Sequence, residues 1–108
     1  MYVIRVHLET PSGRPPREPV AAPAVRHGLE HGLRGPARLS HARIRSTAGA
    51  LDAVVFVAAG TLLEAEDGLR AACGELTGAD GPLSGWRLLH CEADSWLALG
   101  LHELPTPN

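Results

Sequence analysis

Residues 52–59, with the sequence DAVVFVAA, form the most apolar stretch of this 108-residue chain. A short, nearly continuous apolar run rich in β-branched residues predicts a strand at the centre of a sheet, buried on both faces. Hydrophobic residues make up 44% of the chain and charged residues 20%. This balance fits a globular domain and argues against a disordered chain.

Three other segments alternate between apolar and polar residues, which predicts strands. They are residues 3–9, 37–46 and 86–93, and the polarity of the second predicts an edge strand. One face of these strands is expected to carry Ile4, Val6 and Leu8; Ser40, Ala42 and Ile44; and Leu89, Cys91 and Ala93. The other face is expected to carry Arg5, His7 and Glu9; Leu39, His41, Arg43 and Arg45; and Leu88, His90 and Glu92.

Two segments carry helical signals. In residues 20–33, apolar residues recur at four-residue intervals, although Gly28 and Gly32 weaken the helix. The second helix is expected to run from about Thr61 to Leu76, because Thr61 followed three residues later by Glu64 is a capping box.

The element order is therefore strand, helix, strand, strand, helix, strand. This order predicts a ferredoxin-like α+β sandwich, a four-stranded antiparallel sheet in the order 4-1-3-2 with both helices on one face. Residues 1–108 are expected to form one domain, with a proline-rich loop at 10–19, a short C-terminal extension and a tail at 105–108. Residues 96–104 fit either a fifth strand or a short helix.

Charge is distributed unevenly along the chain. Residues 1–50 carry eight Arg and three acidic residues, whereas residues 51–108 carry two Arg and nine acidic residues. Such asymmetry indicates an anion-binding face or self-attraction, unless the strands of the two halves interleave and cancel it. A net charge of -2, a pI near 6.3 and 4% aromatic residues argue against a nucleic-acid-binding domain.

The face of the sheet opposite the helices is the expected binding surface. Its candidate ligand-binding residues are Arg5, His7, His41, Arg43, Arg45 and His90. His7 and His90 fall on neighbouring strands and are expected to lie opposite one another. In an alternative interpretation, the protein is a small dimeric α/β-barrel enzyme in which His7 or His90 is the general acid or base.

The segment His27-Gly-Leu-Glu30-His31 matches a zinc-binding spacing, with two imidazoles on one helix face. The two glycines loosen that helix and the sequence supplies no clear third ligand, so we expect no metal and no other cofactor. A weak metal site at these three residues is the alternative.

Cys73 and Cys91 are the only cysteines and are expected to be packed, reduced thiols. The chain lacks a signal-peptide pattern and a long apolar run, which predicts a cytoplasmic protein with no membrane association. The late apolar residues Trp96, Leu97, Leu99 and Leu101 are candidates for an interface. The sequence favours a non-enzymatic binding or accessory protein, a homodimer that holds a small anionic molecule or a partner protein.

Overall fold

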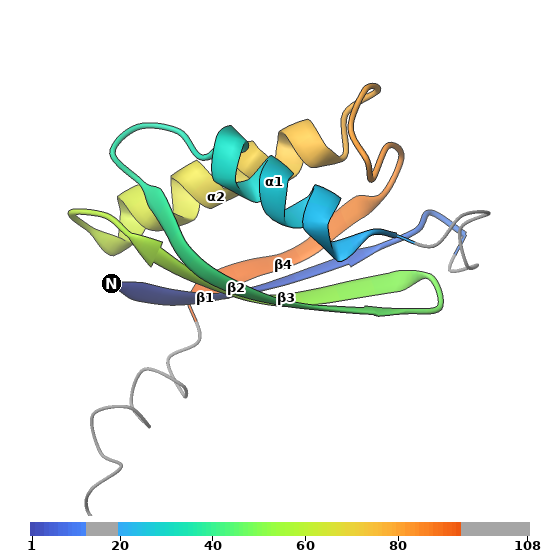
Figure 1. The fold of residues 1–108 in the computed structure, drawn as a ribbon, viewed down its shortest axis with the longest axis horizontal. Coiled ribbons are helices and arrows are strands. Elements are labelled where there is room, and N and C mark those ends of the chain that lie inside the picture. The colour runs from blue at the N-terminus through green and yellow to red at the C-terminus, as the bar shows by residue number, and fades with distance from the viewer. Residues whose placement is uncertain (13–19, 94–108) are drawn as a thin grey trace, which may run out of the picture.

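A computed structural model describes residues 1–12 and 20–93. Over these residues the chain forms a four-stranded antiparallel sheet and two helices, a small α+β domain (Figure 1). Their bounds are β1 Tyr2–Glu9, α1 Ala22–Gly32, β2 Arg38–Thr47, β3 Ala50–Ala58, α2 Leu62–Leu76 and β4 Arg87–Ala93. The four strands and two helices predicted within the described residues are all present, and each boundary differs by two residues or fewer. The segment 96–104, predicted to be a fifth strand or a short helix, lies outside the described residues.

The strands lie in the order β2-β3-β1-β4, which reads β4-β1-β3-β2 from the other edge. The two most apolar strands, β1 and β3, occupy the centre, and the polar strand β2 lies at an edge, as its composition predicts. Both helices lie on the same side of the sheet (Figure 1). The opposite side, called the open face below, bears the side chains that alternate with the buried ones.

The hydrophobic core lies between the sheet and the two helices. Ile4, Val6 and Leu8 of β1 are buried there, as the alternation predicts. The prediction that β3 is buried on both faces is wrong: Leu51, Ala53, Val55 and Val57 are buried, but Val54 and Phe56 are only half-buried and Asp52 is exposed. Both helices pack on one side, so nothing among the described residues forms a second layer on the other.

Two β-bulges change the faces predicted for the edge strands. Ser40 is the extra residue of β2, so Leu39 pairs with Val57 and packs against the core. Leu89 is the extra residue of β4, so Leu88 pairs with Leu8 and packs against the core, whereas Leu89 is 51% exposed. The predicted faces of Leu39, Leu88 and Leu89 are therefore wrong, because an unpaired residue shifts the alternation on one side of it.

The start of α2 follows the predicted chemistry. The Glu64 backbone N–H donates to the Thr61 hydroxyl oxygen at 3.1 Å, and the Thr61 backbone N–H donates to the Glu64 carboxylate at 3.1 Å. This reciprocal capping box satisfies two of the N–H groups that a helix start leaves without partners. In contrast, α1 has no side-chain cap and begins with Pro23 in its first turn.

The glycines of the helices allow close packing. A Cβ at Gly32 of α1 would lie 2.9 Å from Ala72 Cα of α2, and a Cβ at Gly28 would overlap the Leu76 side chain. A Cβ at Gly68 of α2 would lie 2.9 Å from the Arg34 carbonyl oxygen. The glycines that weaken α1 as an isolated helix therefore allow α1 and α2 to lie in contact over the sheet.

Helix side chains also satisfy backbone groups of both edge strands. Arg26 of α1 donates to the Ala42 carbonyl of β2 at 2.8 Å. Arg70 of α2 donates to the Cys91 carbonyl of β4 at 2.9 Å, and Glu66 accepts from the Ala93 N–H at 3.1 Å. Such contacts reduce the tendency of an edge strand to pair with another chain. Among the described residues, neither helix is long and apolar enough to cross a membrane.

Candidate functional site

The predicted ligand-binding residues all lie on the open face. Arg5 and His7 alternate with buried residues of β1, and Arg43 and Arg45 do so on β2. Strand register places their neighbours in rows across the sheet. One row reads Arg43, Val54, Arg5 and Glu92, and the next reads Arg45, Asp52, His7 and His90.

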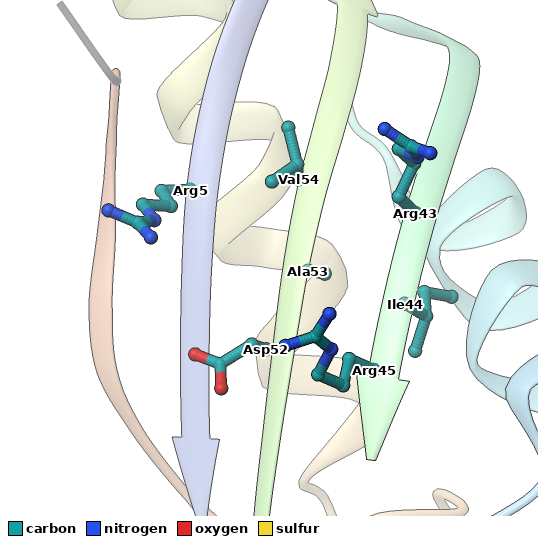
Figure 2. A pocket seen from close by; sticks show the side chains of 7 residues that line it. All are labelled: Arg5, Arg43, Ile44, Arg45, Asp52, Ala53 and Val54. Carbon is teal, nitrogen blue, oxygen red and sulfur yellow. The ribbon is translucent and has the colours of Figure 1, made fainter. Parts of the chain in front are cut away.

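A shallow hollow of about 510 Å³ lies on this face over β1, β3 and β2 (Figure 2). We call it the arginine hollow; its lining residues are Arg5, Arg43, Ile44, Arg45, Asp52, Ala53 and Val54. Three of the six predicted ligand-binding residues thus come together, and they do so around the half-buried apolar side chain of Val54.

The arginines of the hollow differ in orientation. Arg5 extends towards β4, whereas Arg45 extends from β2 over β3 (Figure 2). Within the described part of the chain, neither Arg43 nor Arg45 forms an ion pair. Both are exposed and lie two residues apart on the same strand face, so their Cα atoms are about 7 Å apart. Two cations this close, neither of them in an ion pair among the described residues, create a positive region at one side of the hollow, although Asp52 lies opposite Arg45 on β3.

His7 lies beside the hollow rather than in its lining. Its Nδ1 is 2.6 Å from Asp52 Oδ1, and its Nε2 is 2.7 Å from Glu9 Oε2. An ionised carboxylate only accepts hydrogen bonds, so these two contacts favour the imidazolium form of His7, in which both ring nitrogens donate. The bond to Glu9 and then the bond to Asp52 raise the pKa of His7 above its ordinary value of 6.5, although desolvation opposes them.

The remaining predicted histidines do not join the hollow. His90 is the register partner of His7 on β4, as the sequence predicts. His41 lies near one end of β2, where its ring centroid is 5.9 Å from that of Phe56. The six predicted ligand-binding residues therefore do not form one site; Arg5, Arg43 and Arg45 line the hollow.

The helix residues of the weak metal alternative are all exposed on α1. The His27 and His31 ring centroids are 3.9 Å apart, and His31 Nδ1 donates to the His27 carbonyl at 3.0 Å. Among the described residues, no group of three or more His, Cys, Asp or Glu side chains could hold a metal ion. His27, Glu30 and His31 therefore do not form such a group. The candidate interface residues Trp96, Leu97, Leu99 and Leu101 lie outside the described residues.

The two cysteines are buried in the core and are not joined by a disulfide. Cys73 lies on α2 and Cys91 on β4, and their side chains interact. This interaction, together with burial, raises the pKa of Cys73, and it lowers the pKa of Cys91 against the opposing effect of burial. The pair contributes to the contact between α2 and β4 and lies on the helix side of the sheet, away from the arginine hollow.

The sequence interpretation places Glu9 on the open face but not among the binding residues, and it does not assign Asp52 or Val54 to that face. It makes Asp52 the first residue of a strand buried on both faces. The signal was present: Asp52, Val54 and Phe56 alternate with Leu51, Ala53, Val55 and Val57, and a carboxylate in that series has to point away from the core.

Comparisons with protein-family models, with curated proteins and with solved structures find no match for this chain. Function has to be inferred from the geometry of the open face.

Proposed function

We propose that this protein is a non-enzymatic binding protein that holds a small anionic molecule in the arginine hollow. One observation carries the proposal: Arg43 and Arg45 extend from the same face of β2 and line the hollow, and neither has an ion-pair partner among the described residues. Guanidinium groups present rigid, paired donors that match carboxylate and phosphate oxygens. A bound anion would relieve the repulsion between the two cations.

The hollow also favours an organic anion over an inorganic one. Val54 lies between the arginines of β2 and β1 and is half-buried, so it offers apolar contact to the body of a ligand. The expected ligand is a carboxylate or a phosphate ester with an apolar portion. Its charged group would lie on Arg43 and Arg45, and its apolar portion would lie over Val54.

The state of His7 supports binding rather than catalysis. A general base needs a nitrogen lone pair that points at the substrate, and both nitrogens of His7 donate to carboxylates. His90 is exposed on the edge strand β4, outside the lining of the hollow. The enzyme alternative therefore has less support than the binding proposal.

We also propose a ferredoxin-like fold for this domain. The βαββαβ element order and the order β4-β1-β3-β2, with both helices on one face, support it. A homodimer that packs through the sheet and a cytoplasmic location are proposals of the same kind.

The binding proposal is tested by titrating the full chain with benzoate, phenyl phosphate and sulfate while recording the arginine side-chain NMR signals. We expect Arg43 and Arg45 signals to shift first, with phenyl phosphate binding more tightly than sulfate. The R43A/R45A double variant should bind at least about tenfold more weakly, since two charged contacts are lost.

The matched control is Arg38→Ala, an exposed arginine on the same strand outside the hollow. It should change affinity by less than about twofold for an exposed, distant charge. Equal losses in R38A and in R43A would show nonspecific charge attraction, and no shift with any of the three anions would refute the proposal.

A further inference from the structure

Among the described residues that line the arginine hollow, Asp52 is the acidic one. It lies between two cationic side chains, Arg45 and His7. In the register of the sheet, Asp52 lies opposite Arg45 of β2 on one side and opposite His7 of β1 on the other. Its carboxylate turns towards β1, away from Arg45 (Figure 2). Its oxygen lies 2.6 Å from His7 Nδ1, and no ion pair joins it to Arg45.

The other groups around His7 come from its own strand and from β4. Glu9 holds the second ring nitrogen at 2.7 Å, and His90 lies opposite His7 on β4. Arg5 precedes His7 on the same face, and Arg87 is the register partner of Glu9. Glu9 therefore has a cation opposite it on β4, just as Asp52 has Arg45 opposite it on β2.

We propose that His7 is a positioning residue for the anion site: by holding Asp52 it leaves Arg45 available to the ligand, and loss of a proton from His7 releases Asp52 to pair with Arg45. This inference rests on the proposed function. It assigns His7 an indirect role, in which the imidazolium occupies the competing carboxylate and does not touch the ligand.

The physical reason is the number of N–H groups on the ring. The imidazolium has two, one for each carboxylate, whereas the neutral ring has one for two carboxylates and no charge to attract either. Asp52 can then lower its energy by rotating towards Arg45, its neighbour across the strand pair. Arg45 is neutralised and contributes less to binding of an anion.

Anion affinity should therefore fall as the pH rises through the pKa of His7. The bonds to Glu9 and Asp52 raise the pKa of His7 above 6.5, so the tight-binding state is complete below that pH and is lost as the pH passes through the pKa of the folded protein. One exposed ion pair is at stake, so the fall should be about fivefold.

The test uses sulfate, whose charge is constant from pH 6 to pH 9.5, titrated into the full chain and followed by NMR. The wild type should bind about fivefold more weakly at high pH, with a midpoint that coincides with the NMR titration of the His7 ring. A midpoint that follows His90 would overturn the proposal. The control His27→Gln, on an exposed part of α1, should keep the wild-type profile.

Three variants separate positioning from direct attraction. His7→Gln should bind weakly at every pH, and Asp52→Asn should bind tightly at every pH. In the H7Q/D52N double variant, tight binding should be retained because no competing carboxylate remains. If His7 instead attracted the anion directly, the double variant would bind more weakly than D52N, and this outcome would overturn the proposal.

Glu9→Gln gives a further check, because it removes one bond that raises the pKa of His7. The midpoint should move to lower pH while the affinity at low pH stays as in the wild type. The fall at high pH should be smaller, because the one N–H of the neutral ring then has a single carboxylate, Asp52, to bond. Sulfate binding that does not vary with pH would reject the coupling and leave the binding proposal intact. If sulfate does not bind, benzoate, whose charge is also constant over this range, takes its place in the same titration. Absence of binding by sulfate, benzoate and phenyl phosphate alike would reject both proposals.

Discussion

The imidazole of His7 illustrates how neighbours decide the chemistry of a residue. Its alternation in β1 is sufficient to place it on the open face, where a histidine could bind an anion or act as a base. Its actual neighbours are two carboxylates, at 2.6 and 2.7 Å. They favour its protonated form, which is a different role from the one predicted for it.

The stability of the protein should reflect this cation. Because the pKa of His7 is raised in the folded state, its ion pairs stabilise the protein fully below the unfolded value of about 6.5, and this stabilisation is lost as the pH rises through the folded value. The His7 side chain is 28% exposed, so we expect less than about 1 kcal/mol. Urea unfolding of wild type and H7Q should differ at pH 6 and converge near pH 9; a difference that is constant with pH would contradict this.

At the scale of elements, two glycines of α2 differ in their surroundings. Gly68 of α2 faces the Arg34 carbonyl at 2.9 Å and Ala37 Cβ at 3.0 Å, measured from the position of an added Cβ. Gly74 of the same helix is exposed and has nothing within 4 Å of that position. The sequence alone gives both glycines the same cost in helix propensity.

The same substitution in one helix should therefore have opposite effects. Gly68→Ala should destabilise the protein by about 1–3 kcal/mol, because backbone and core atoms would have to move apart. Gly74→Ala should stabilise it by about 0.5–1 kcal/mol through helix propensity. Thermal or urea unfolding measures the change in the free energy of unfolding for each variant. If both variants were more stable than the wild type, the contact at Gly68 would relax without cost.

The edge strands show how tertiary contacts complete an element. The polarity of β2 predicts its position at the edge of the sheet. The partner of its Ala42 carbonyl is not predicted by that pattern, because it is Arg26 of α1, 16 residues earlier in the chain. On β4, Glu66 and Arg70 make the equivalent contacts from α2. These contacts occupy backbone groups of the edge strands that could otherwise pair with another chain.

At the scale of the whole molecule, the order of the strands redistributes the charge of the two halves of the sequence. β1 and β2 come from the basic half, β3 and β4 come from the acidic half, and they interleave in the sheet. His7 of the basic half bonds Asp52 of the acidic half, and Arg34, which follows α1, pairs with Glu75 of α2. Interleaving of the strands thus brings opposite charges of the two halves together, whereas Arg43 and Arg45 form no ion pair among the described residues.

The open face is also where we expect a second copy to pack. The helices cover the other face, and helix side chains bond both edge strands. In such a dimer the arginine hollow would be enclosed between two sheets. Sedimentation should show a dimer that Phe56→Glu converts to monomer, whereas Leu63→Glu, on the 63%-exposed residue at the start of α2, should leave it intact. A monomeric wild type would refute the dimer and leave anion binding to be tested on its own.

The sequence by itself determined the elements, the central and edge strands, the capping box of Thr61 and Glu64, and the face on which Arg5, Arg43 and Arg45 lie. These features depend on residues two to four positions apart, which a local pattern records. Tertiary structure decided the bulges at Ser40 and Leu89, the close approach at the glycines and the pairing of His7 with Asp52, 45 residues away. The reason is that strand register and side-chain partners are selected by packing between distant segments, which no local pattern contains.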